Sequence, residues 1–359
     1  MWKSNWEETK RHFIEWWNGK GLVVGMWGAP RRGGSPREAP PEIHATVSPD
    51  ERYLDAGARV KRSHAQLACE AFPADVLPVL ETDMGPGSLA FYLGATPEFT
   101  ESTVWFRPAF EGHETPESLP ALSFDPHNRW WRLTEATLRA AVELARGRYL
   151  VGCPDLVEGI DVLASLRGAE TLLMDMVDRP EWVEQKLEEI KRAWFEAYRR
   201  VYEIIRLEDG SSAFGAFRIW GPGKTAKLQC DAGAMISPEM FRRFAVPGLR
   251  AQCRWLDHSV FHLDGTQALC HLDALLEIGE LNAVEWTPQD GIEGGGDRRW
   301  FPLYRKILDA GKSVQAVGVQ AHEVAPLLDA LGGAGMYILT TFRDEEEGER
   351  MAAAVDRYR

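Results

Sequence analysis

Ser259-Val260-Phe261-His262-Leu263-Asp264-Gly265 is the stretch of sequence that decides the fold we predict. Ser259 to Phe261 reads as the start of a short buried strand, in which alternate residues point to the same side. We therefore expect His262 and Asp264 to project together from the strand's end, where Gly265 lets the chain turn. Such a pair at the carboxyl end of a buried strand is typical of the active site of an α/β barrel. A core histidine bonded to a turn aspartate is the alternative interpretation.

Other short apolar segments extend this pattern along the chain. Eight strands are predicted, at residues 22–26, 76–80, 149–153, 213–220, 259–264, 282–286, 313–317 and 336–340. Each is followed by a helical pattern, and the polar segment after the fourth strand reads as a loop. The alternation predicts an α/β fold, a (β/α)₈ TIM barrel with an N-terminal extension and inserted loops. An open doubly wound sheet is disfavoured because no G-x-G-x-x-G turn follows the first strand.

The domain organisation expected is a single barrel domain spanning residues 1–359. An N-terminal helix is predicted within residues 1–20, and residues 99–124 read as an insertion rich in proline, threonine and aromatic residues. A helix capped by Ser48 is expected to run to about Glu70.

Composition excludes several classes of partner. The net charge is −13, with 54 acidic and 41 basic residues and no basic arm, which argues against nucleic acid. No apolar run reaches the 18 residues of a membrane span, and the polar start lacks the core of a secretory signal. The five cysteines form no C-x-x-C pair, so we expect a reducing, cytoplasmic location.

Polar side chains follow the predicted strands, where a barrel gathers its active site. The strand ends supply Trp27, Arg31, Glu81, Asp83, Cys153, Asp155, Trp220, His262, Asp264, Glu285 and Arg343, and the loop after the fourth strand adds Lys227 and Cys230. Converging acids raise one another's pKa unless a cation lies among them. We therefore expect a divalent metal, a cationic substrate or proton-transfer chemistry. The alternatives are helix caps for Asp83 and Asp155, a solvated loop charge for Arg31 and a buried thiol for Cys230.

The segment from Cys230 to Phe241, in which I-S-P-E-M-F opens a helix, resembles the uroporphyrinogen decarboxylase superfamily. His262-Leu263-Asp264-Gly265 and residues 161–179 resemble it too. The resemblance implies a (β/α)₈ barrel. It also implies either a porphyrin decarboxylase or a methyltransferase that charges a corrinoid protein or a thiol such as coenzyme M.

The methyltransferase branch binds zinc with a His-x-Cys-Gly stretch and a later cysteine. Here the stretch reads His262-x-Asp264-Gly265, and no cysteine follows Cys270. The resemblance therefore implies a harder metal site at His262 and Asp264, helped by Glu285 or Asp83, which suits zinc first and also manganese or iron. Thiol methylation by the usual route of the branch is in doubt.

The decarboxylase branch matches in fewer places. Arg31 or Arg32 matches its arginine-rich loop and Asp83 its pyrrole-binding aspartate. The third unit has no tyrosine, and the last strand ends at Thr340-Thr341-Phe342-Arg343 without a histidine. A true uroporphyrinogen decarboxylase is therefore not expected.

Three functions remain open. The first is a metal-assisted methyltransferase with Asp83, His262, Asp264 and Glu285 as catalytic residues. The second is a lyase or decarboxylase of a small polycarboxylate, anchored by Arg31, Lys227 and Arg343. The third is a non-catalytic ligand-binding barrel. The partners expected are a small-molecule substrate, a corrinoid protein and a second copy of the chain.

Overall fold

The computed structural model describes residues 1–25, 29–42, 53–100, 104–110 and 118–359. In these ranges the strands are β1 (Leu22–Gly25), β2 (Ala29–Pro30), β3 (Glu70–Ala71), β4 (Val79–Leu80), β5 (Thr96–Phe99), β6 (Val104–Arg107), β7 (Leu150–Cys153), β8 (Ser212–Phe214), β9 (Ile219–Gly221), β10 (Thr225–Gln229), β11 (His258–Asp264), β12 (Ala283–Thr287), β13 (Ser313–Val319) and β14 (Met336–Thr340).

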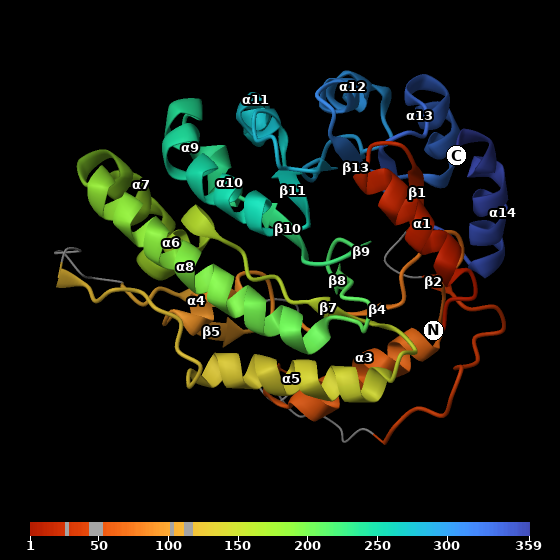
Figure 1. Ribbon diagram of the computed structural model, residues 1–359, viewed down its shortest axis with the longest axis horizontal. Coiled ribbons are helices and arrows are strands. Elements are labelled where there is room, and N and C mark those ends of the chain that lie inside the picture. The colour runs from red at the N-terminus through yellow and green to blue at the C-terminus, as the bar shows by residue number, and fades with distance from the viewer. Residues whose placement is uncertain (26–28, 43–52, 101–103, 111–117) are drawn as a thin grey trace.

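Helices surround these strands (Figure 1). The α-helices are α1 (Trp6–Trp17), α3 (Ala56–Ala68), α4 (Ser88–Tyr92), α5 (Arg129–Ala145), α6 (Gly159–Arg167), α7 (Ala169–Asp178), α8 (Pro180–Ile205), α9 (Pro238–Phe244), α10 (Val246–Trp255), α11 (Leu272–Leu276), α12 (Phe301–Asp309), α13 (Val324–Leu331) and α14 (Glu345–Val355). Short 3₁₀ helices are η2 (Asp231–Met235), η3 (Thr266–His271), η4 (Arg298–Trp300), η5 (Ala321–Glu323) and η6 (Asp356–Tyr358). No helix of the described ranges is both long and apolar enough to span a bilayer.

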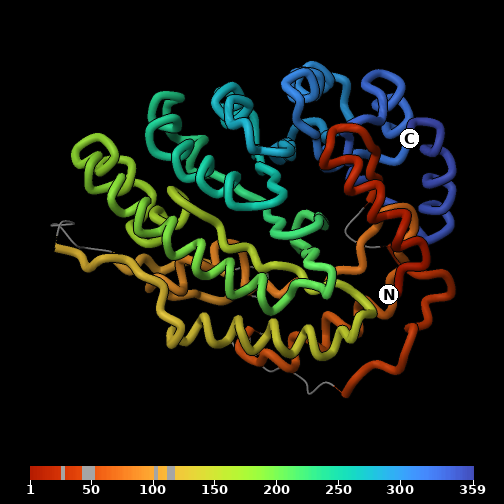
Figure 2. The backbone as a smooth tube through the Cα atoms, viewed as in Figure 1, coloured from red at the N-terminus to blue at the C-terminus, as the bar shows by residue number. Residues whose placement is uncertain are grey.

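The strands form two main sheets. One is parallel throughout, in the order β1–β14–β13–β12–β11–β10. The other has the order β4–β7–β8–β9, in which only the β8–β9 pair is antiparallel. The pairing of β1 with β14 brings the two ends of the chain side by side, as the red and blue segments of Figure 2 show. A backbone hydrogen bond of 2.8 Å from Asp75 to Val24 joins β1 to the segment before β4.

The turn at residues 215–218, between β8 and β9, links the two sheets. Arg218 donates from its guanidinium to the Val79 carbonyl in β4 at 3.0 Å. Its own carbonyl accepts from the Tyr337 hydroxyl of β14 at 2.6 Å, and the Phe217 carbonyl accepts from the Gln315 amide of β13 at 2.7 Å. Residues 217 and 218 of the turn are therefore hydrogen-bonded to strands of both sheets.

A row of polar residues crosses the six-stranded sheet in register. Gln229 in β10 pairs with His262 in β11, His262 with Glu285 in β12, and Glu285 with Gln315 in β13. Because paired residues in a parallel sheet share a face, these side chains lie on one side of the sheet. Gln229, His262 and Glu285 of this row lie toward the carboxyl ends of β10, β11 and β12, where the candidate site is found.

Local sequence explains where several helices begin. Asp55 caps α3 by accepting from the Ala58 amide at 2.9 Å, and Asn128 caps α5 by accepting from the Trp130 amide at 2.8 Å. Ser237 caps α9, with Pro238 in its first turn. The predicted start at Ser48 lies outside the described residues, and the helix they show begins at Ala56.

The prediction of a fourth strand at residues 213–220 is wrong. Those residues form the β8–β9 hairpin, and the segment predicted as a loop contains β10. Arg218, with a φ of +50°, ends any extended run there. The N-terminal helix is α1. The region predicted as an insertion, residues 99–124, begins within the β5–β6 hairpin, at the last residue of β5, and its residues 101–103 and 111–117 lie outside the described ranges. The assignment of residues 1–359 to one domain stays a prediction.

Candidate functional site

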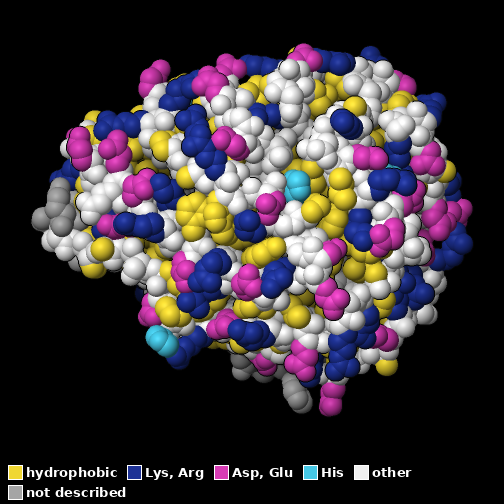
Figure 3. Space-filling model, viewed as in Figure 1, with side chains coloured by type: hydrophobic (Ala, Val, Ile, Leu, Met, Phe, Trp, Pro, Cys, Tyr) yellow, Lys and Arg dark blue, Asp and Glu magenta, His cyan; other side chains and the backbone are white. Residues whose placement is uncertain are grey.

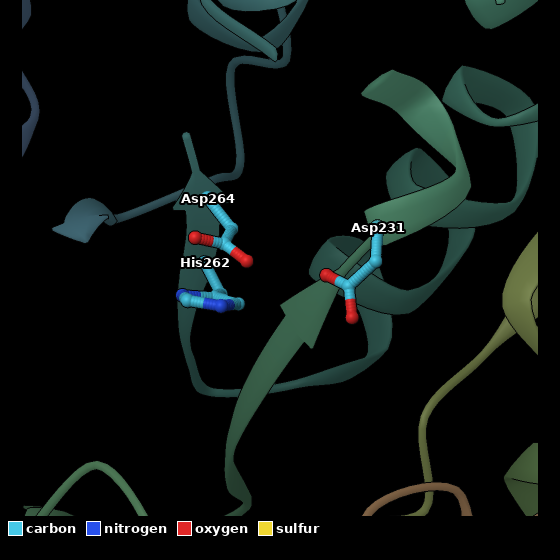
Figure 4. Close-up of side chains that lie close together, drawn as sticks. All are labelled: Asp231, His262 and Asp264. Atoms are coloured by element: carbon cyan, nitrogen blue, oxygen red, sulfur yellow. The ribbon is translucent and has the colours of Figure 1, made fainter. Parts of the chain in front are cut away.

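Three side chains with metal-ligand atoms meet where β10 and β11 end. Ligand atoms of Asp231, His262 and Asp264 all lie within 4.8 Å of one another. Figure 4 shows the three side chains gathered around one point, His262 and Asp264 from β11 and Asp231 from the residues after β10. The two carboxylates are exposed and the imidazole is half-buried. We call these residues the triad.

Glu285 orients the imidazole of the triad. Its carboxylate is fully buried and bonds to His262 Nδ1, and its second oxygen accepts from the Thr287 hydroxyl at 2.6 Å. Because Nδ1 is engaged, Nε2 is the ring nitrogen left for another ligand. Burial opposes charge on the ring, but the adjacent Glu285 carboxylate outweighs it, so the pKa of His262 lies above its ordinary value.

A buried ion pair lies behind the triad. Lys227 of β10 holds the Asp155 carboxylate at 2.8 and 2.9 Å, and its ammonium also donates to the Gln229 amide oxygen. The Lys227 side chain is fully buried and that of Asp155 is 9% exposed. The rings of Phe214 and Phe217 lie 5.7 and 5.5 Å from the ammonium. The charge of Lys227 is therefore already compensated inside the protein.

Gln229 connects this ion pair to the triad. Its amide nitrogen donates to the Asp231 carboxylate at 2.6 Å. Asp161 accepts from the Asp231 and Ala232 backbone amides, both at 2.8 Å, and so fixes the start of η2. Desolvation by the surrounding side chains, together with the neighbouring Asp161 carboxylate, raises the pKa of Asp231 to about 6.

Two further acids of the network, the half-buried Asp83 and the buried Glu158, hold their protons more tightly than usual. Burial, reinforced by the Asp155 carboxylate, raises the pKa of Asp83 to about 7. Asp83 accepts from the backbone amide of Asp155. Burial also raises the pKa of Glu158 well above its ordinary value, although its carboxylate accepts from the Gln229 backbone amide. The network from Asp83 to Asp231 is thus suited to proton storage near neutral pH.

The donor set of the triad fits a divalent metal. One imidazole nitrogen and two carboxylate oxygens are ligands that zinc, manganese and iron accept, and three protein ligands leave a position open for substrate. The set contains no thiolate, so it favours harder ions than a cysteine site does. Glu285 supplies the outer carboxylate that histidine ligands usually have.

Several residues predicted at the strand ends are engaged elsewhere. The Arg31 backbone amide donates to Cys69 at the end of α3, and its guanidinium donates to the Ser35 carbonyl at 2.9 Å. Glu81 pairs with Arg218 of the hairpin turn at 2.9 Å, and Arg343 pairs with Glu347 at 3.0 Å.

The two tryptophans predicted at the strand ends do not add to the triad. Trp220 packs against Trp6 and Phe13 of α1, with ring centroids 5.5 and 6.4 Å apart. Trp27 lies outside the described residues.

The two predicted cysteines are buried thiols. Cys153 ends β7 and Cys230 follows β10, and both are less than 10% exposed. Burial raises the pKa of each thiol well above its ordinary value, so both carry their protons at neutral pH. Among the described residues, neither belongs to the group that could hold a metal.

Sequence reasoning missed Asp231, Gln229, Glu158 and Asp161. The signal that could have found two of them is the alternation Lys227-x-Gln229-x-Asp231, which places polar side chains on one face of a strand and its extension. Glu158 and Asp161 come from the start of α6 and carry no comparable pattern.

Comparisons with known proteins show the fold. No family model matches this sequence, and no curated protein matches it. The solved structure of a methyltransferase from Methanosarcina mazei covers 98% of this chain and 98% of its own, with a TM-score of 0.63 and 11% identity. A B12-independent methionine synthase from Shewanella sp. W3-18-1, in complex with selenomethionine, covers 94% of this chain and 98% of its own, with a TM-score of 0.46 and 9% identity. The first likeness, with the parallel sheets, confirms the predicted α/β fold of the TIM-barrel class.

Proposed function

We propose that this protein is a metal-dependent methyltransferase and a divergent member of the uroporphyrinogen decarboxylase superfamily. The observation that carries the proposal is the triad, which offers three metal ligands at adjacent strand ends of a TIM-barrel fold. The overall likeness to a methyltransferase structure along 98% of the chain supports the choice of reaction. Zinc is the first candidate, with manganese and iron as alternatives.

The residues of this chain would prepare the site for that reaction. Bound at the triad, a divalent metal would supply Lewis-acid activation of a small nucleophile by lowering its pKa. Glu285 keeps the His262 ring in the orientation that leaves Nε2 for a ligand. Gln229 does the same for the Asp231 carboxylate. Asp83, with a pKa of about 7, would accept a proton released at the site.

The methyl donor we propose is a corrinoid carried by a partner protein, as the resemblance of His262-x-Asp264-Gly265 to the methyltransferase branch implies. The exposure of Asp231 and Asp264 supports this, because a donor held by another protein must reach the metal from outside. A reducing, cytoplasmic location belongs to the same proposal and is supported by the five free cysteines. A homodimer stays a prediction.

A lyase or decarboxylase is the second candidate, and Asp83 is the observation that favours it. A half-buried carboxyl with a pKa of about 7 is suited to proton transfer to a carbon atom. The anchors predicted for a polycarboxylate are less suited, because Lys227 and Arg343 are paired with acids and Arg31 donates to a backbone carbonyl. We therefore place methyl transfer first.

A non-catalytic binding barrel is the third candidate. Desolvating Asp83, Glu158 and Asp161 costs stability, because each must give up either its charge or part of its solvation. Chains keep such costly clusters mainly at functional sites. The network therefore weighs against a barrel that has lost its chemistry.

The test is a methyl-transfer assay after metal removal. Protein stripped with a chelator is loaded with Zn²⁺, Mn²⁺ or Fe²⁺, and methylcobalamin with coenzyme M or homocysteine is followed by absorbance. We expect activity only after one of the metals is returned, and its loss in Asp264→Asn. The exposed Asp290→Asn, in the loop after β12, is the matched control. Full activity of the stripped protein refutes the proposal, and release of carbon dioxide from a candidate acid would favour the lyase.

A further inference from the structure

A cavity separate from the triad lies beside the end of β10. It has a volume of about 310 Å³ and opens between α8 and α10, close to the start of α6. On the molecular surface, a patch of hydrophobic side chains lies over the junction of α8 and α10 (Figures 1 and 3). The volume is at the lower end of the range of about 300–1,000 Å³ that small-molecule sites occupy.

The floor of this cavity is largely apolar and contains a few buried polar groups. Ile160, Phe244 and Leu249 are buried and form part of the apolar wall. Glu158 and Gln252 also line it, with exposed fractions of 4% and 2%. An apolar wall with a small number of fixed polar groups is the usual composition of a ligand site.

The charged side chains at the rim are already paired with one another. Arg243 bonds to Glu184 of α8 at 2.7 Å, and Lys191 bonds to Glu188 at 2.5 Å. An anionic or cationic ligand would have to compete with these pairs for its partner. The rim therefore favours a neutral molecule.

Glu158 is the polar group best placed to recognise such a molecule. One of its carboxyl oxygens accepts from the Gln229 backbone amide, and the group is buried at the start of α6. Burial raises the pKa of this carboxyl well above its ordinary value, and a protonated carboxyl can donate a hydrogen bond as well as accept one. The buried Cys230 side chain lines the same wall.

We propose that the cavity between α8 and α10 binds a small, neutral, mostly apolar molecule that carries one hydrogen-bonding oxygen, as an alcohol, a phenol or an amide does. The site is separate from the triad and does not depend on a bound metal. Gln229 lies between the two sites, because its backbone amide donates to Glu158 and its side-chain amide donates to Asp231.

The test uses 4-fluorophenol as the neutral probe and 4-fluorobenzoate as an anion of similar size, each followed by fluorine NMR. Gly248 of α10 lines the cavity, and a Cβ added there meets nothing within 4 Å. Gly248→Phe should fill the cavity. Gly279→Phe is the matched control, because a Cβ at the exposed Gly279 also meets open space, outside the cavity lining.

We expect 4-fluorophenol to bind the intact protein at millimolar concentration and 4-fluorobenzoate to bind at least about tenfold more weakly, a difference of about 1.4 kcal/mol. Gly248→Phe should abolish phenol binding and Gly279→Phe should preserve it. Should Gly248→Phe fail to fold by circular dichroism, Gly248→Leu takes its place with the same expectation. Equal binding of the phenol to the filled and intact proteins, no binding to the intact protein, or equal binding of the benzoate overturns the proposal.

Discussion

Replacing Lys227 with methionine should destabilise this protein far more than replacing a surface lysine. The Lys227 side chain is fully buried against an Asp155 side chain that is 9% exposed. Removing one partner of a buried ion pair leaves the other charge without compensation, which costs about 3–5 kcal/mol. Lys224→Met is the matched control, because Lys224 pairs with Asp257 at 3.1 Å and both side chains are partly exposed. Exposed pairs are worth about 0–1 kcal/mol.

The assay is urea unfolding at pH 8, followed by tryptophan fluorescence, for both lysine variants and for the double variant Lys227→Met/Asp155→Asn. The double variant removes both charges, so it should recover at least half of the stability that Lys227→Met loses. A loss in Lys227→Met no larger than that in Lys224→Met would refute the role of Lys227 as the internal counter-ion.

The pH dependence of the same variant has a definite sign. Burial raises the pKa values of Glu158 and Asp231, and the ammonium of Lys227 works against that rise. Without Lys227, these acids in the folded protein bind protons more tightly than in the unfolded chain. The free energy of unfolding then decreases as pH rises, because the folded state binds protons that the unfolded state has already released. The stability lost in Lys227→Met should therefore be smaller at pH 5 than at pH 8.

Three further changes test other parts of the structure. Burial against Trp17 lowers the pKa of His258 to about 4, so between pH 6.5 and 4 the unfolded chain binds a proton that the folded protein does not. The free energy of unfolding should therefore decrease as the pH is lowered, by up to about 1.4 kcal/mol per pH unit. His258→Gln should flatten that slope in urea unfolding, and an unchanged slope would contradict the assignment. The Asp75 carboxylate is fully buried, and nitrogen atoms of His12 and Arg359 lie 2.7 Å from its oxygens. Asp75→Asn should therefore lower the free energy of unfolding by about 3 kcal/mol or more in the same assay. A loss below about 1 kcal/mol would contradict a buried ion-pair role for Asp75. A Cβ on Gly152 would lie 2.8 Å from the Gly215 backbone, so Gly152→Ala should cost about 1–3 kcal/mol and lower the Tm, whereas Gly279→Ala should leave the Tm unchanged; equal Tm values for the two variants would contradict the close packing of the hairpin turn.

The fold was predictable where strands are buried on both faces. Segments such as Ser259 to Phe261 and Met336 to Thr340 appear as short apolar runs, because helices cover one side of a parallel sheet and the interior covers the other. β10 was not predicted as a strand because Lys227 and Gln229, whose polar side chains join the network, interrupt its apolar pattern. The β8–β9 hairpin was read as one strand because its turn, residues 215–218, is itself partly apolar.

The candidate site was predictable only in part. The close spacing of His262 and Asp264 is enough to place both at one strand end, and the structure brings them together. Asp231 was not assigned as a ligand because the strand before it was missed. The partner of Lys227 lies 72 residues away in another strand–helix unit, and nothing local in the sequence indicates which acid it meets. Pairings of this kind depend on how the units pack.

The central claim, a metal site formed by Asp231, His262 and Asp264, is tested most directly by titrating the chelator-treated protein with Zn²⁺ in a calorimeter. We predict that one equivalent of Zn²⁺ binds per chain. Asp231→Asn removes a direct ligand, so it should weaken binding by more than the factor of about 10–100 that the loss of an outer-shell partner costs. Asp290→Asn should leave the affinity unchanged. Binding of Zn²⁺ to Asp231→Asn as tight as to the intact protein would contradict the claim.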